Sequence, residues 1–62
     1  MAKPKFSRGQ TVVVPHQDSK PHFFSGVGVV TNLLRLNRSW RYDITFDSGR
    51  KEEVEEVRIE TR

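Results

Sequence analysis

The side chains best suited to chemistry in this sequence are basic groups gathered around its single tryptophan. They fall within 17 consecutive positions: Arg35, Arg38, Trp40, Arg41, Arg50 and Lys51. A guanidinium group forms paired hydrogen bonds with phosphates or carboxylates and stacks on aromatic rings, and an indole offers a flat face to any base. The pattern predicts a basic and aromatic face that binds a polyanion or an acidic surface. The alternative is that Trp40 only ends a row of core side chains.

A second candidate patch combines three aromatic residues. Phe23 and Phe24 are neighbours in the chain, so in an extended segment only one of them can point inward. The exposed ring, together with Tyr42, would form an aromatic wall of the kind that binds peptides or cationic side chains. The alternative is that one of the two phenylalanines covers an open end of the fold.

No constellation of residues predicts catalysis. His16 and His22 are six positions apart, there is no cysteine, and no acidic residue completes a recognised ligand spacing, so we predict no metal site and no cofactor. The serines occur in turn-like contexts, and none has the surroundings of a catalytic nucleophile. We therefore expect no catalytic residue and a protein that is not an enzyme.

Strands rather than helices are expected to position these groups. From 40 to 46, large apolar and polar residues alternate strictly, which indicates a strand with one buried face. The stretch 26–36 is also strand-like, but its apolar residues fall on both faces, as in a strand that bends through a β-bulge or a glycine. A β-branched run at 10–15 forms the first strand, in which Val12 and Val14 point inward.

The C-terminal part of the chain admits two interpretations. In one, a strand begins at Lys51 and a short last strand begins near Arg58, with a single helical turn between them. In the other, 51–62 forms an amphipathic helix, because Val54 and Val57 are three positions apart and glutamate favours helices. We favour strand, turn and strand, because the apolar face of such a helix is interrupted.

Length and charge set further limits. The 62 residues form a single domain, and a domain this small buries roughly 60% of the surface that its unfolded chain exposes. The formal net charge is +3: residues 1–50 carry 8 basic and 3 acidic residues, and residues 51–62 carry 3 and 5. Residues 1–8 are expected to form a flexible basic arm whose Phe6 tucks against the domain at 9–62. With no cysteine and no apolar run that could span a bilayer, the protein is predicted to be cytoplasmic.

The order of these elements resembles a known architecture. A Gly-x-x-Val-x-Val-Pro opening is followed by a long loop, a Gly-Val-Gly-Val-Val strand, a hairpin, a Tyr-x-Ile-x-Phe-Asp-x-Gly strand and turn, and Glu-Glu-Val. This order is similar to the SH3-like small barrel of Tudor, KOW and CarD-type RNA polymerase-interaction domains, and to the SH3-like accessory subunit of photosystem I and related ferredoxin-docking subunits. The residues that carry the resemblance are Gly9, Val12, Val14, Pro15, Gly26, Gly28, Val30, Tyr42, Ile44, Phe46, Asp47, Gly49 and Val54.

Pattern and resemblance together predict an all-β fold: a five-stranded, strongly bent antiparallel SH3-like barrel with a short helical turn before the last strand. The predicted function is a non-enzymatic binding module that binds DNA, RNA or nucleoprotein of the transcription or translation machinery through the basic and aromatic face. The alternative is a docking or accessory subunit that turns the same face toward an acidic protein partner, with Leu33 or Leu36 as apolar contacts. The apolar stretch from Leu33 to Leu36 is also compatible with a homodimer.

Overall fold

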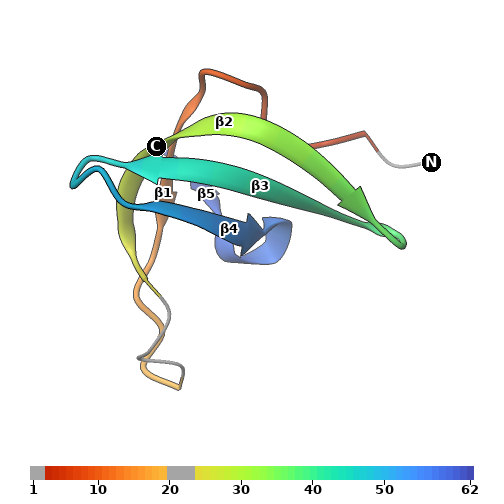
Figure 1. Ribbon diagram of the computed structural model, residues 1–62. Coiled ribbons are helices and arrows are strands. Elements are labelled where there is room, and N and C mark those ends of the chain that lie inside the picture. Colours follow the sequence, from red (N-terminus) through yellow and green to blue (C-terminus); the bar gives the residue numbers. More distant parts are fainter. Residues whose placement is uncertain (1–2, 20–23) are drawn as a thin grey trace.

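The computed structural model describes residues 3–19 and 24–62, and its strands form one antiparallel sheet (Figure 1). The order of strands in the sheet is β4-β3-β2-β1-β5. The elements are β1 (Thr11–Val14), β2 (Gly26–Leu36), β3 (Ser39–Phe46), β4 (Lys51–Glu55), the 3-10 turn η1 (Glu56–Arg58) and β5 (Glu60–Thr61). The prediction of five antiparallel strands with one helical turn before the last is confirmed, and the helical interpretation of 51–62 is wrong. Among the described residues, no helix has the length and apolarity that a membrane span requires.

A β-bulge bends β2, the longest strand. The register of its pairing with β3 shifts between Val30 and Asn32, so Thr31 is an extra residue on the β2 side. The bulge reverses the alternation of faces, and Val30 and Leu33, three positions apart, both lie toward the core. Figure 1 shows the resulting curvature of β2. The two sets of apolar positions in 26–36 are thus explained by the bend that the sequence predicts.

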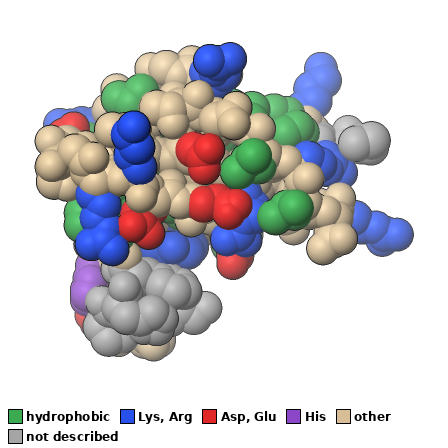
Figure 2. Space-filling view, viewed as in Figure 1, with side chains coloured by type: hydrophobic (Ala, Val, Ile, Leu, Met, Phe, Trp, Pro, Cys, Tyr) green, Lys and Arg blue, Asp and Glu red, His purple; other side chains and the backbone are tan. Residues whose placement is uncertain are grey.

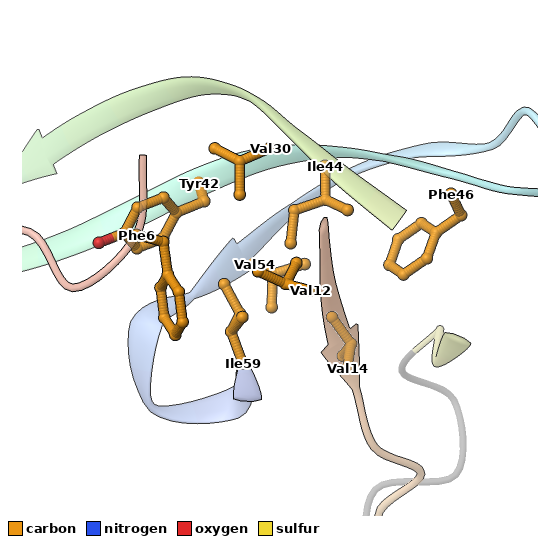
Figure 3. Close-up of a cluster of buried hydrophobic side chains, with 9 residues drawn as sticks. All are labelled: Phe6, Val12, Val14, Val30, Tyr42, Ile44, Phe46, Val54 and Ile59. Carbon is orange, nitrogen blue, oxygen red and sulfur yellow. The ribbon is translucent and has the colours of Figure 1, made fainter. Parts of the chain in front are cut away.

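The core lies on the inner face of the bent sheet (Figure 3). Nine buried hydrophobic side chains form it: Phe6, Val12, Val14, Val30, Tyr42, Ile44, Phe46, Val54 and Ile59. The inward orientation predicted for Val12 and Val14 is confirmed, since these side chains are 0% and 1% exposed. The core therefore joins residues from opposite ends of the chain, and the strict alternation of β3 leaves its odd-numbered side chains on the outer face.

The N-terminal arm is part of this packing. Phe6 is buried, and its ring meets the ring of Tyr42 edge to face with the centroids 5.4 Å apart. The backbone N–H of Gly9 donates to the carbonyl oxygen of Val30 at 2.8 Å. The expected tuck of Phe6 against the domain is confirmed, and it holds the exposed basic side chains of the arm close to the sheet: Lys3, Lys5 and Arg8.

A glycine allows β2 and β3 to approach closely. A Cβ atom at Gly28 would lie 2.7 Å from Ile44 Cγ2 and 2.7 Å from the carbonyl oxygen of Thr45. Neither neighbour can withdraw without disturbing the core or the strand pairing, so only glycine fits. This close approach occurs between the two strands whose far ends carry the candidate site.

Candidate binding surface

The hairpin that joins β2 to β3 brings three of the predicted residues together. Asn37 and Arg38 form its turn, and Asn37 has φ 57°, a conformation that asparagine adopts more readily than most residues. Arg35 and Trp40 are direct partners across the two strands. The guanidinium carbon of Arg35 lies 5.2 Å from the centroid of the Trp40 ring, which is a cation–π contact. Arg35, Arg38 and Trp40 thus define the hairpin end of the molecule.

Trp40 lies between the core and the surface. Its side chain is partly buried and packs against the core cluster, as expected for the end of the β3 row. It also lines a shallow pocket of about 140 Å³ between the hairpin and the η1 turn. The other lining residues are Arg38, Ser39, Glu55, Glu56 and Val57. Trp40 therefore both ends the row of core side chains on β3 and contributes part of its ring to the surface.

The η1 turn supplies the opposite wall of this pocket. Val57 is 84% exposed, and it lines the pocket together with Trp40. The hydroxyl of Tyr42 donates to Glu56 Oε2 at 2.6 Å, and the backbone N–H of Lys5 donates to the same oxygen at 3.1 Å. These bonds fasten the η1 turn to β3 and to the arm, so the wall is held in place.

The same contacts perturb Tyr42. Burial of the side chain, followed by its hydrogen bond to the Glu56 carboxylate, raises the pKa of Tyr42 from 10.0 to about 12. The phenol therefore stays protonated and remains a donor across the physiological range. The hydroxyl thereby holds the Glu56 carboxylate in place.

The pocket contains charges of both signs, but they differ in their partners. Glu55 Oε1 lies 3.5 Å from Arg41 Nη1, and Glu56 accepts the two hydrogen bonds described above. Within residues 3–19 and 24–62, no ion pair involves Arg38. Arg38 is therefore the lining cation that no carboxylate of the described residues pairs with, while Glu56 keeps its negative charge because both of its donors are neutral.

Arg41 does not join the hairpin end. It lies on the outer face of the sheet, where its guanidinium is 3.5 Å from both Glu53 and Glu55, and its side chain is 28% exposed. The carboxylates of β4 thus already neutralise this arginine. Sequence position placed Arg41 beside Trp40, but alternation along β3 directs the two side chains to opposite faces.

Arg50 and Lys51 lie at the other end of β3, beside the turn to β4. An eight-residue strand separates them from the hairpin end by roughly 25 Å. Arg50 Nε lies 2.7 Å from Glu52 Oε2, and its guanidinium carbon is 4.8 Å from the centroid of Phe24. The predicted single basic face is therefore corrected to two separate groups. On the face of the molecule that Figure 2 shows, acidic side chains lie toward the middle, and most Lys and Arg side chains lie toward the margins.

The predicted aromatic wall is also corrected. Tyr42 is 0% exposed and belongs to the core, because it shares the inner face of β3 with Ile44. Phe24 is partly buried, and its ring meets Phe46 with centroids 4.6 Å apart, in agreement with the alternative that one phenylalanine covers an end of the core. Phe23 lies outside the described residues.

A larger hollow lies on the outer face of the sheet. It has a volume of about 410 Å³ and is lined by Thr31, Asp43, Lys51, Glu52 and Glu53. Asp43 and Glu53 are direct partners across β3 and β4, so two like charges face each other there. Carboxylates therefore predominate in this hollow, although Lys51 of the second basic group also lines it.

Sequence reasoning missed the contribution of η1. Val57 was assigned to a helical turn, but nothing local in the sequence indicates that this turn would carry it to Trp40. Val57 is exposed whereas Ile59 is buried, and this difference depends on how the η1 turn packs against β3. Comparison with protein-family models, with curated proteins and with solved structures found no match. The candidate site therefore rests on geometry alone.

Proposed function

We propose that this chain is a non-enzymatic protein-interaction module that docks through its hairpin end onto an acidic surface of a protein partner. The observation that carries the proposal is the combination of Arg38, which no carboxylate of the described residues neutralises, with the Trp40 ring and the exposed Val57. Tryptophan and arginine are the residue types most enriched among those that dominate the energy of protein interfaces. Leu36 is 53% exposed and lies next to the hairpin turn, but it follows Arg35 in β2 and so points to the opposite face of the sheet from Arg35 and Trp40.

The distribution of charge favours a protein over a nucleic acid. Binding to a phosphate backbone gains its affinity from many unpaired Lys and Arg side chains along one continuous path. Here Arg41 and Arg50 are already paired with glutamates, and Asp43 and Glu53 lie between the two basic groups. A compact patch of one tryptophan, arginines and a few apolar side chains suits the mixed composition of a protein interface.

Nucleic-acid binding is the second candidate, and the N-terminal arm is the observation that favours it. Lys3, Lys5 and Arg8 are exposed, and the arm is hydrogen-bonded to Tyr42 and Glu56 near the hairpin end. These cations add to Arg38 beside an aromatic ring that offers a face to a base. The resemblance to SH3-like barrels accommodates both candidates and does not choose between them.

The experiment is a quantitative capture of host proteins by the immobilised chain, with variants at the two ends. Arg38→Glu reverses the charge at the hairpin end, and Lys51→Glu makes the same change at the other end as a matched control. We expect Arg38→Glu to abolish capture of an acidic partner and Lys51→Glu to retain most of it. Equal loss in both variants would contradict a localised docking surface.

The same two variants separate the candidates when titrated with single- and double-stranded oligonucleotides at low and moderate salt. We expect no binding at moderate salt, because the unpaired cations are few. Oligonucleotide binding that is steeply salt-dependent and is lost in Arg38→Glu would instead support the second candidate. A sedimentation measurement on the unmodified chain would test whether the chain forms a homodimer.

A further inference from the structure

We propose that the pocket between Trp40 and Val57 receives one apolar side chain of the partner, and that Arg38 binds a carboxylate next to it in the partner's sequence. This inference rests on the proposed docking function and names the element that is recognised: a short segment in which an apolar residue has an acidic neighbour. The pocket holds the apolar side chain, and Arg38 binds the carboxylate of the neighbouring residue.

The size of the pocket limits what it can hold. Sites for small molecules typically enclose about 300–1,000 Å³. The pocket of about 140 Å³ has room for four or five water molecules at about 30 Å³ each, which is the room that one side chain requires. The pocket thus matches one side chain of a partner, with the rest of the partner lying outside it.

The walls determine the polarity of the occupant. The indole of Trp40 and the exposed side chain of Val57 form apolar surfaces on two different elements. Each remains partly in contact with water in the free protein, so an apolar side chain between them would remove both surfaces from solvent. Two apolar side chains that line one pocket are a suitable place for such an insertion.

The lining of the pocket carries two carboxylates and one guanidinium, so the partners that these groups already have decide what can bind beside them. The two carboxylates of the lining, Glu55 and Glu56, already interact with Arg41 and with the donors Tyr42 and Lys5. A further cation would also lie near Arg38, and the indole already carries the guanidinium of Arg35. A carboxylate at the rim instead meets Arg38, whose charge no ion pair of the described residues neutralises.

The pocket is also preorganised. Trp40 is fixed by the core on one side and by Arg35 on another, and Glu56 is fixed by Tyr42. A ligand that enters therefore orders few additional side chains, which reduces the entropic cost of binding.

The test uses short capped peptides and the fluorescence of Trp40, the single tryptophan of the chain. The probe is an Asp-Leu-Glu peptide, and its controls are Asn-Leu-Gln, Asp-Ser-Glu and Lys-Leu-Lys. We expect the probe to change the fluorescence with a dissociation constant below about 1 mM, and each control peptide to bind about tenfold more weakly or worse. Preference for Lys-Leu-Lys, or no response to the probe, would overturn the inference.

Variants locate the binding within the chain. Val57→Ser and Arg38→Gln should each weaken binding of the probe about tenfold, whereas Lys51→Gln at the far end of β3 should leave it unchanged. Circular dichroism would confirm that Val57→Ser, at an exposed position, keeps its fold. An unchanged affinity in Val57→Ser would overturn the assignment of the pocket.

Failure of this inference is distinguishable from failure of the proposed function. If capture of a protein partner depends on Arg38 but not on Val57, the docking function stands and the pocket assignment falls. If capture depends on neither residue, both proposals fall.

Discussion

The hydroxyl of Tyr42 is the polar contact that fastens the candidate site to the core, so its removal is the most informative stability experiment. Tyr42→Phe leaves the ring in place but deletes the 2.6 Å hydrogen bond to Glu56 and the 3.1 Å bond from Lys5 N–H. A hydrogen bond to a charged group contributes about 1.5–3 kcal/mol. Lys5 N–H keeps Glu56 Oε2 as an acceptor, so we expect a loss near the lower limit, about 1.5 kcal/mol.

The loss should be visible in thermal unfolding. For a domain of this size, 1 kcal/mol corresponds to about 4–8 °C in Tm, so Tyr42→Phe should unfold roughly 6–12 °C below the unmodified chain. Glu60→Gln, a change at an exposed residue in β5, is the matched control and should shift Tm little. Equal Tm values for Tyr42→Phe and the unmodified chain would refute the reasoning.

The pH dependence gives an independent check on the same bond. Because the folded-state pKa of Tyr42, about 12, lies above the unfolded value of 10.0, the stabilisation is complete below pH 10 and is lost as pH rises toward 12. The stability difference between the unmodified chain and Tyr42→Phe should therefore shrink from pH 10 to pH 12. Tyr42 is the single tyrosine, so ultraviolet absorbance reports its ionisation directly. Titration of the folded protein at pH 10 would contradict the proposed bond.

Three further substitutions test other parts of the account by chemical denaturation. Gly28→Ala places a Cβ atom 2.7 Å from Ile44 Cγ2 and from the Thr45 carbonyl oxygen, and we expect it to lower the free energy of unfolding by about 1–3 kcal/mol or more. Unchanged stability would refute the close approach. Arg41→Gln removes two half-exposed ion pairs with Glu53 and Glu55 and should cost at most about 1 kcal/mol, less in high salt, whereas a larger loss would show a structural function for Arg41. Val54→Ala empties a site that is 1% exposed and should cost about 2 kcal/mol, whereas Val57→Ser should change stability by no more than about 0.5 kcal/mol. The reverse order for the two valines would contradict the placement of η1.

The strands were predictable because burial imposes a period of two on each of them. Strict alternation from Trp40 to Phe46 identified β3, and the two sets of apolar positions in 26–36 identified a bend. The position of the bulge at Thr31 was not predictable, because it depends on how β2 pairs with β3. The same alternation already placed Tyr42 with Ile44 on the inner face, so its assignment to a surface wall could have been avoided.

The binding surface was less predictable because it depends on contacts between distant elements. Proximity in sequence grouped Arg41 with Trp40, but the register of β3 with β4 pairs Arg41 with Glu53 and Glu55. In the same way, the direction of a three-residue turn decides whether Val57 meets Trp40. Residue types thus predicted an arginine and tryptophan site, and the fold selected which arginine remains available.

The central claim, that ligands dock at the hairpin end, is tested most directly by mapping the backbone amide resonances of the chain during titration with the Asp-Leu-Glu peptide. The account predicts shifts confined to the hairpin around Arg38 and Trp40 and to the η1 turn around Val57. Shifts centred on Arg50 and Lys51, or no shifts at any amide, would contradict it.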